Sequence, residues 1–304
     1  MTLLIGFTGQ GSQYPGMFNH LKLDEFGLQW LTEASELLGL NLLDEHIIRK
    51  HCFDVLYSQL FIALLSVGAF RSIQASLPSQ VLLCGYSLGE VAAFCASAQI
   101  PLDKMIELIK QRVNCMIEAA GNKPAGLTVL KGNINLVSAS ALAHQFNCHL
   151  AIIINSDHVV IGGLNENMDL LINEAHSQGI LKIERLPIQL PSHTPILQTA
   201  TVNFSSYLQT ECQNYTMSYP ILNALTVTMI SATSEMLPVL ANELSHTLHW
   251  NKLMHIAEEY NMDRFLDLGP KSTLKNMFSR VNPAMRTYAL DDFDKVSGLR
   301  TILR

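Results

Sequence analysis

Apolar residues in this chain form either short continuous runs or runs with helical spacing. Residues 3–7 and 81–85 are aliphatic runs of strand length that lead into glycine-containing turns. The segments between and after them have apolar positions three and four residues apart, which predicts helices. Those helices are expected at residues 28–48, 54–76, 89–98 and 102–120, the last ended by Gly121 to Pro124. Strands that alternate with helices predict an α/β body with a mostly parallel sheet.

The stretch from residue 125 to 187 has a different pattern. Its apolar runs predict elements in the order β-α-β-β-α-β, which is typical of a ferredoxin-like unit. The expected strands are 127–130, 149–154, 158–161 and 180–186, and the expected helices are 134–146 and 166–178. We therefore predict a body formed by residues 1–124 and 188–304, with a ferredoxin-like subdomain inserted at 125–187. After Pro187 the pattern is mainly helical, with one further apolar run at 264–268.

The first candidate for chemistry is the segment Gly85-Tyr86-Ser87-Leu88-Gly89. It follows an aliphatic run and opens into a helical segment, which is the strand-turn-helix context of a nucleophile elbow. Glycines permit the strained turn, and the start of the helix favours a developing negative charge. A simple capping turn from Ser87 to Glu90, with no chemistry, is the alternative. The strand-turn-helix context favours Ser87 as a nucleophile.

An arginine on the apolar side of a predicted helix is the second candidate. On a helix over residues 105–120, Arg112 falls between Ile109 and Met116 on the apolar face, where no acid is available. A buried guanidinium without an anionic partner would cost several kcal/mol. Its partner is either a structural carboxylate or the carboxylate of a substrate, which a planar guanidinium binds well. Beside a nucleophilic serine, the substrate carboxylate is favoured.

A serine nucleophile needs a base, most often histidine. His193 lies between two prolines just after an apolar strand, where a rigid loop could direct it into a site; a surface turn histidine is the alternative. His246, His249 and His255 are close together, but their spacing does not fit a compact zinc site, and we predict no metal. No aspartate is marked as a third triad member, so a backbone or amide oxygen is expected to orient His193.

Composition restricts the class of protein. The 304 residues include 48% apolar and 15% charged residues, with a net charge of −6 and no block of Lys or Arg, which argues against nucleic-acid binding. The six cysteines form no C-x-x-C pair and are expected to be buried thiols in a reducing compartment. No basic segment precedes the first apolar strand, and no apolar stretch approaches the roughly 18 residues of a membrane span. We therefore expect a cytoplasmic protein.

Taken together, the motifs resemble the malonyl-CoA:acyl carrier protein transacylases. They occur in the family's order from residue 3 to about 280, so the resemblance covers nearly the whole chain. It implies an α/β-hydrolase-like body with a ferredoxin-like insert. The matching segments are Gly9-Gln10-Gly11-Ser12-Gln13 with Gly16-Met17, the Gly85–Glu90 elbow, Arg112 with Met116, Asn155 before Val159 to Gly163, Pro191-Ser192-His193, and Leu268-Gly269-Pro270.

The resemblance implies a role for each matching residue. Ser87 would become malonylated, with His193 as its base, and Arg112 would bind the malonyl carboxylate beside Met116. The backbone N–H groups of Gln10 and Leu88 would form the oxyanion hole. Asn155 is expected to support the pocket. His249, which precedes Trp250, is expected to supply the main-chain carbonyl that orients the base.

Several departures from the family pattern resemble one branch, the epsilon subunit of malonate decarboxylase. Tyr86 replaces the usual histidine, Thr8 a proline, and Lys271 a glycine, while Ser58-Gln59 replaces the usual Gln-Pro. The expected function is malonyl transfer from malonyl-CoA to the phosphopantetheine-type thiol of an acyl carrier protein, and this branch would add other malonate decarboxylase subunits as partners. No tightly bound cofactor, nucleic acid or membrane is expected. The alternatives are a housekeeping fatty-acid or polyketide transacylase, a serine thioesterase or esterase, and a non-catalytic docking subunit.

Overall fold

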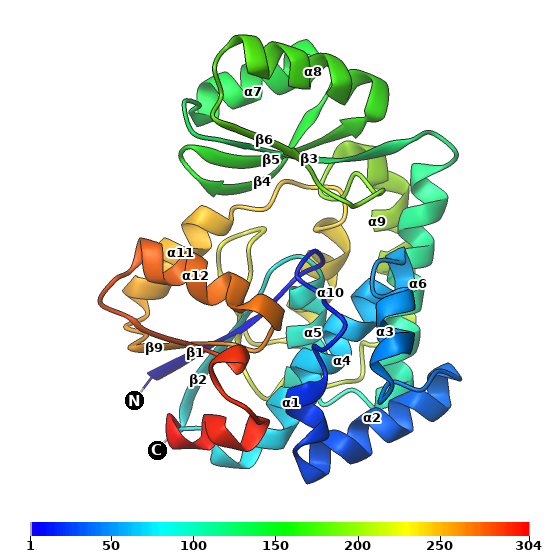
Figure 1. Cartoon of the computed structure of the whole chain (residues 1–304), viewed down its shortest axis with the longest axis vertical. Helices are drawn as coiled ribbons and strands as arrows, with labels where there is room; N and C mark the ends of the chain where they lie inside the picture. The colour runs from blue at the N-terminus through cyan, green and yellow to red at the C-terminus, as the bar shows by residue number, and fades with distance from the viewer. Residues whose placement is uncertain (1, 304) are drawn as a thin grey trace.

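The computed structural model describes residues 2–303 and contains two sheets (Figure 1). The larger sheet has the strand order β10-β9-β1-β2-β7-β8, and neighbouring strands are parallel except β8, which runs antiparallel to β7. Its strands are β1 (Thr2–Phe7), β2 (Gln80–Gly85), β7 (Ile221–Leu222), β8 (Met229–Ile230), β9 (Arg264–Asp267) and β10 (Arg286–Ala289).

Helices cover both faces of this sheet. Successive side chains of a strand point to opposite faces, so each strand contributes apolar residues to both layers of helices. Two apolar clusters lie on opposite faces of the sheet. Leu3 and Ile5 of β1 belong to the first cluster, and Leu4 between them belongs to the second. The first cluster is shared with α2, α4, α5, α6, α9 and α10, and the second with α11 and α12. The helices are α1 (Asn19–Lys22), α2 (Glu25–Leu38), α3 (Glu45–His51), α4 (Val55–Ile73), α5 (Leu88–Ser97), α6 (Leu102–Ala120), α9 (Gln198–Glu211), α10 (Thr233–Asn242), α11 (Trp250–Glu259) and α12 (Thr273–Val281).

The smaller sheet is antiparallel, with the order β4-β5-β3-β6. Together with its two helices it forms the β-α-β-β-α-β unit of a ferredoxin-like fold. Figure 1 shows it above the body, with both helices on the outer side of the sheet. The predicted fold class, an α/β body with a mostly parallel sheet and a separate antiparallel subdomain, is confirmed. The elements are β3 (Ala125–Lys131), α7 (Leu136–Gln145), β4 (His149–Asn155), β5 (His158–Leu164), α8 (Asn165–Ser177) and β6 (Lys182–Arg185).

Two predictions about the body were wrong in detail. The single helix expected at 28–48 is two helices, because Gly39 adopts a φ of 64° and ends α2. The mainly helical pattern after Pro187 also hid β7, β8 and β10, which are only two to four residues long. Such short strands carry too few residues for an alternation to be visible in the sequence.

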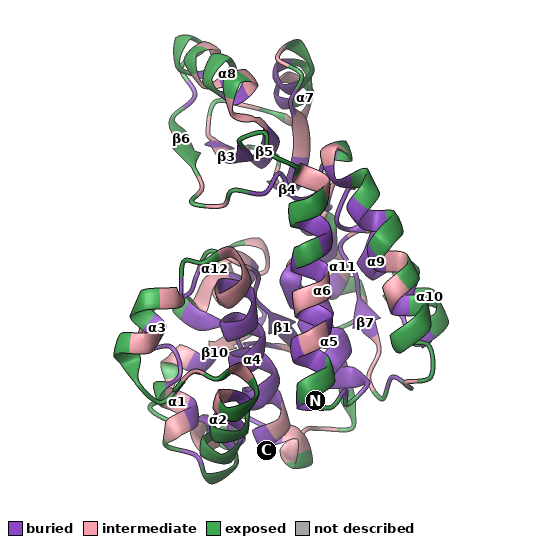
Figure 2. Cartoon of the chain, turned by 90° about the vertical axis from the view of Figure 1, so that its right-hand side faces the viewer, coloured by how far each residue is buried: buried purple, intermediate pink, exposed green. Residues whose placement is uncertain are grey.

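Burial differs sharply between the helices (Figure 2). All ten residues of α5 are buried, whereas α7 and α8 expose their outer faces.

Val55–Ser76 is long and apolar enough to cross a membrane, with a mean hydropathy of 1.4, so the expectation that no segment approaches a membrane span was wrong. This segment is 83% buried inside the protein, as in a core helix. All six cysteines are buried and free, as predicted.

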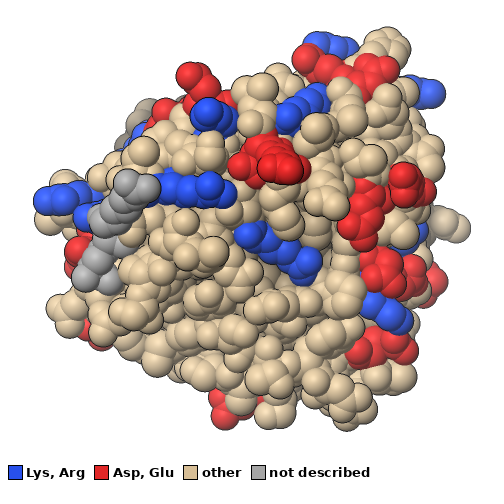
Figure 3. All heavy atoms as spheres, turned by 90° about the horizontal axis from the view of Figure 1, so that it is seen from below, with Lys and Arg blue, Asp and Glu red and all other residues tan. Residues whose placement is uncertain are grey.

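The outer face of the body, on the side away from the subdomain, carries charges of both signs interspersed (Figure 3). A broad area of that face shows neither Lys, Arg, Asp nor Glu. The interspersed pattern fits the modest net charge of −6 and provides no continuous basic surface on this face.

Candidate active site

Ser87 lies at the sharp turn between β2 and α5. Its backbone has φ 56° and ψ −117°, a conformation that costs a non-glycine residue about 1–3 kcal/mol. The flanking glycines leave no room for a side chain: a Cβ on Gly85 would lie 2.0 Å from the Glu90 nitrogen, and one on Gly89 would lie 1.8 Å from the Phe7 oxygen. The close approach of three backbone segments therefore explains the Gly-x-Ser-x-Gly spacing, and it presents the serine hydroxyl at the start of α5.

The structure brings His193 to Ser87. The imidazole Nε2 lies 2.7 Å from Ser87 Oγ, and Nδ1 lies 2.5 Å from the main-chain oxygen of Glu243. Because a carbonyl oxygen only accepts, Nδ1 carries the proton and Nε2 is free to accept one from the serine. Burial and the nearby Arg112 lower the pKa of His193 to about 3. The imidazole is therefore neutral at pH 7, the form that a general base requires.

The loop that carries His193 is fixed by its own hydrogen bonds. His193 has a φ of 63°, and its N–H donates to the Leu244 oxygen at 2.8 Å. Thr194 Oγ1 donates to the Pro191 oxygen at 2.6 Å. These contacts hold a strained backbone in place, so the imidazole has little freedom to leave the serine.

Arg112 lies on the buried side of α6, only 2% exposed. Its Nη1 donates to Gln59 Oε1 at 2.6 Å and lies 3.4 Å from Met116 Sδ, and its Nη2 lies 3.5 Å from Ser87 Oγ. Within residues 2–303 it forms no ion pair, and its Nε has no hydrogen-bond partner. Burial lowers its pKa to about 10, so the guanidinium is still charged at pH 7. A buried cation with only neutral direct partners lies beside the serine.

A cavity of about 220 Å³ opens onto this serine and histidine. One wall belongs to the body and includes Gln10, Tyr86 and Met277. The opposite wall is the lower face of the subdomain sheet with the strand that leads back to the body. Its apolar lining is formed by Leu127, Val129, Ile152, Ile154, Val160, Leu186 and Ile188.

Comparison with known proteins agrees with this geometry. A family model described as the acyl transferase domain matches residues 6–281. The chain belongs to the acyl transferase domain family. It is 25% identical over 306 residues to a probable mitochondrial malonyl-CoA-acyl carrier protein transacylase of Drosophila melanogaster, covering 92% of this chain and 79% of that protein. The expectation of an acyltransferase is confirmed.

Two solved structures share the fold of this acyltransferase. The malonyl-CoA:acyl carrier protein transacylase of Helicobacter pylori has a TM-score of 0.89 at 22% identity, covering 100% of this chain and 98% of that one. A type II PKS malonyl-transacylase in complex with its acyl-carrier protein has a TM-score of 0.88 at 22% identity, covering 100% and 99%. The resemblance to the transacylases is thus supported at the level of the family, and the malonate decarboxylase branch receives no support.

Two residues that the sequence marked only as departures from the family pattern also form part of the site. Gln59 holds the Arg112 guanidinium, and Ser58 Oγ accepts a hydrogen bond from the Gln10 amide at 2.8 Å. Both lie on α4 and are at most 1% exposed. Two polar residues at the start of an otherwise apolar helix were the signal available in the sequence.

The expectation that His249 supplies the orienting carbonyl is wrong. The carbonyl that accepts from His193 belongs to Glu243, six residues earlier, because the chain turns back toward the active site at the end of α10. His249 instead stands at the N-cap position of α11 without a side-chain capping hydrogen bond, and its N–H donates to the Ala224 oxygen at 2.8 Å.

The remaining predicted positions are placed as follows. The N–H groups of Gln10 and Leu88 have no hydrogen-bond acceptor within residues 2–303, so they are free to bind an oxyanion. Asn155 lies at the end of β4, next to Ile154, but does not line the cavity. Its expected supporting role remains a prediction.

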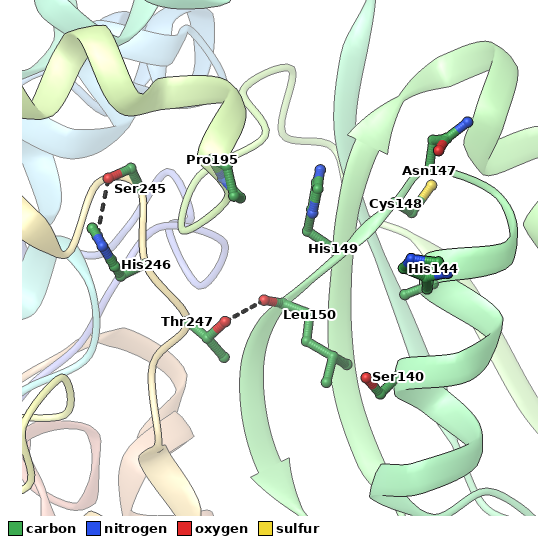
Figure 4. A pocket seen from close by; sticks show the side chains of 11 residues that line it. Ser140, His144, Asn147, Cys148, His149, Leu150, Pro195, Ser245, His246 and Thr247 are labelled. Carbon is green, nitrogen blue, oxygen red and sulfur yellow. Dashed lines mark hydrogen bonds between the residues drawn. The ribbon is translucent and has the colours of Figure 1, made fainter.

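A larger cleft of about 650 Å³ is lined by residues of both the subdomain and the body (Figure 4). His144 and His149 of the subdomain face Ser245 and His246 of the body across it. Thr247 Oγ1 donates to the Leu150 oxygen at 2.7 Å, which ties β4 to the segment after Glu243. Over residues 2–303, no three His, Cys, Asp or Glu residues are grouped so as to hold a metal ion. Ser245 Oγ lies 3.0 Å from His246 Nδ1 in this cleft, and none of the residues that line the cleft also lines the cavity at Ser87.

Proposed function

We propose that this acyltransferase moves a malonyl group from malonyl-CoA to the prosthetic-group thiol of an acyl carrier protein, through a malonyl-serine intermediate. The observation that carries the proposal is the buried, unpaired guanidinium of Arg112 beside the nucleophilic Ser87. A malonyl thioester has an ester-like reacting carbon and a free carboxylate two bonds away. Ser87 can attack the first, and Arg112 can bind the second. The fatty-acid or polyketide type of transacylase is favoured, because the relatives reported above are of that kind.

Acylation would start when the malonyl carboxylate binds Arg112. Ser87 Oγ attacks the thioester carbon while its proton passes to His193 Nε2, and Nδ1 keeps its proton, which it donates to the Glu243 carbonyl oxygen. The tetrahedral oxyanion accepts from the N–H groups of Gln10 and Leu88. Losing one such donor typically lowers the rate by about 10² to 10³. The C–S bond then breaks, and His193 returns the proton to the leaving CoA sulfur.

Transfer to the carrier repeats these steps with the carrier thiol as the nucleophile. His193 accepts the thiol proton, the thiolate attacks the malonyl-serine carbonyl, and the proton returns to Ser87 Oγ. The intermediate must survive until the carrier arrives. The apolar subdomain wall over the serine, which includes Ile154 and Val160, lowers the access of water to the ester.

Selectivity follows from the same buried charge. An acetyl group would leave the guanidinium of Arg112 desolvated and unpaired, whereas malonyl neutralises it. Sites that leave a buried polar group unpaired discriminate strongly against the substrate that lacks the partner. The carboxylate is therefore the recognised feature of the acyl group.

Intact-protein mass spectrometry tests the proposal. Brief incubation with malonyl-CoA should add one malonyl group to the wild type and none to Ser87→Ala, and acetyl-CoA should label far more slowly. Addition of a phosphopantetheine-bearing carrier protein should then remove the label and acylate the carrier. Failure to form the adduct on the wild type would support a non-catalytic docking subunit.

Two further arms of this experiment separate the alternatives. Release of free malonate at the same rate with and without the carrier would indicate a thioesterase. A carrier that bears the longer, CoA-derived prosthetic group distinguishes the malonate decarboxylase branch. Preference for that carrier would favour the branch suggested by Tyr86 and Lys271, and preference for ordinary phosphopantetheine would exclude it.

A further inference from the structure

Two buried carboxyl groups belong to residues adjacent to the Ser87–His193 pair, since Glu90 follows Ser87 on α5 and the main-chain oxygen of Glu243 accepts from His193. Glu90 is on the first turn of α5 and is 0% exposed, and Glu243 is at the end of α10 and is 1% exposed. Glu90 Oε2 accepts from the Ala224 N–H at 3.3 Å. If both groups are ionised, no donor within residues 2–303 forms a hydrogen bond with Glu90 Oε1 or with either carboxyl oxygen of Glu243.

Neither carboxyl group forms an ion pair within residues 2–303. Buried carboxylates without hydrogen bonds or a cation are strongly disfavoured, so one group must carry a proton and donate it to the other. Burial raises the pKa of Glu90 most, followed by the charge of Glu243 and by a hydrogen bond between the two side chains. Glu90 is therefore the protonated donor and Glu243 the acceptor.

We propose that Glu90 and Glu243 form a proton-sharing carboxyl pair whose single negative charge is the counter-charge of the active site. Glu243 is then a positioning residue in two ways. Its main-chain carbonyl fixes the tautomer of His193, and its carboxylate stabilises the positive charge that develops on the imidazole. This proposal rests on the proposed acyl transfer through Ser87.

The groups that face the pair agree with this assignment. Arg112 comes from α6, His193 from the loop before Pro195, and Cys84 from β2. Burial raises the pKa of the Cys84 thiol well above its usual value, so it stays neutral. Burial also raises the pKa of Glu243, to about 7, against the opposing effects of Glu90 and Arg112. The pair thus changes from neutral to singly charged near neutral pH.

The charge matters because His193 becomes an imidazolium during each half-reaction. Arg112 opposes that change, since it already lowers the pKa of His193. When the malonyl carboxylate neutralises Arg112, the carboxylate of Glu243 remains to stabilise the imidazolium. An opposite charge close by typically favours the charged form by about tenfold or more.

Glu243→Gln is the decisive variant, because it keeps the main-chain carbonyl and the shape of the side chain but removes the charge. The readout is the second-order rate of Ser87 acylation by malonyl-pantetheine, which lacks the titrating phosphate of CoA. For the wild type we expect the rate to fall about fivefold between pH 8 and pH 6, following the ionisation of Glu243. For Glu243→Gln we expect a rate about tenfold lower at pH 8 and almost independent of pH. Glu235→Gln, which removes an exposed carboxylate from the same helix, should behave as the wild type.

Infrared spectroscopy of the substrate-free protein provides an independent readout. The C=O stretch of one protonated carboxyl should persist above pH 8 and disappear in Glu90→Gln, and a second should be lost near pH 7 and disappear in Glu243→Gln. Unchanged pH profiles in Glu243→Gln, or the absence of a protonated carboxyl above pH 8, would overturn the proposal. Because the infrared measurement needs no substrate, it remains decisive even if the wild type forms no malonyl adduct.

Discussion

The body and the subdomain meet at the same cavity but contribute opposite kinds of surface to it. The body supplies the nucleophile, the base, the guanidinium and the two buried carboxyl groups, all held by hydrogen bonds in strained or desolvated positions. The subdomain sheet supplies mainly aliphatic side chains to the same space. The chemistry is therefore concentrated in one layer of the molecule, and the other layer controls what reaches it.

Backbone strain follows the same division. In the body, the residues with positive φ include Ser87, Gln99, Val227, Lys271 and Ser272, whose residue types do not favour it, together with His193 and Asn261. In the subdomain, the residues other than glycine with positive φ are Asn133 and Asn147, a residue type that tolerates this conformation. Residue types that disfavour positive φ therefore adopt it in the body and not in the subdomain, and one of them is the nucleophile Ser87.

The largest expected effect comes from removing the cation of the body. Arg112→Ala should lower kcat/KM for malonyl-CoA by about 10² to 10³, because a desolvated charge pair is lost. Acetyl-CoA should be used relatively better than before, because the desolvated charge that discriminates against it is removed. Steady-state kinetics with both thioesters measures the change, with Lys110→Ala on the same helix as the control. An equal loss for malonyl and acetyl would show that the guanidinium does not bind the carboxylate.

A buried carboxylate in the body should also affect stability more than an exposed one in the subdomain. Asp267 Oδ1 accepts from Thr8 Oγ1 and the Gly269 N–H, and Oδ2 accepts from the N–H groups of Leu274 and Lys275. In Asp267→Asn, the amide NH₂ must face donors in either orientation, so unfolding in urea should show a loss of about 2–4 kcal/mol.

The matched variant is Asp169→Asn on α8, where an exposed carboxylate pairs with Arg185. Its stability should change by less than about 0.5 kcal/mol, because surface ion pairs contribute little. Similar losses for the two variants would contradict the contrast between a polar network inside the body and a solvated subdomain surface.

The apolar wall of the subdomain predicts a smaller, kinetic effect. Val160 lines the cavity, and Val159 on the same strand packs against the outer helices. Val160→Thr places a hydroxyl near the acyl-serine at almost constant volume, and we expect the malonyl-enzyme to hydrolyse about two to five times faster. Val159→Thr places the same hydroxyl on the opposite face and should leave the lifetime of the adduct unchanged. The decay of the adduct without an acceptor, followed by mass spectrometry, compares the two.

The sequence predicted the parts of this arrangement that depend on side-chain patterns. The helix expected at 102–120 is α6, with Arg112 on its buried face, and the Gly-x-Ser-x-Gly elbow stands where strand gives way to helix. The orienting carbonyl of Glu243 was not predictable, because a main-chain oxygen leaves no trace in the residue type. The proton-sharing pair required Glu90 and Glu243, far apart in the chain, to meet in space. Gln59 was noticed only as a departure from the family pattern, and its role followed from its contact with Arg112.

The smallest expected effect concerns strain in the body outside the reacting groups. Lys271 has a φ of 60°, which disfavours a residue with a Cβ by about 1 kcal/mol, and its N–H donates to Asp291 Oδ2 at 2.6 Å. Lys271→Gly keeps that hydrogen bond and removes the strain, but it increases the entropy of the unfolded chain. The two effects nearly cancel, so we expect stabilisation of at most about 0.5 kcal/mol in urea unfolding. Lys50→Gly inside α3 should instead destabilise by about 1 kcal/mol, because no strain is relieved there. If both glycine variants lose the same stability, the left-handed backbone at Lys271 carries no strain.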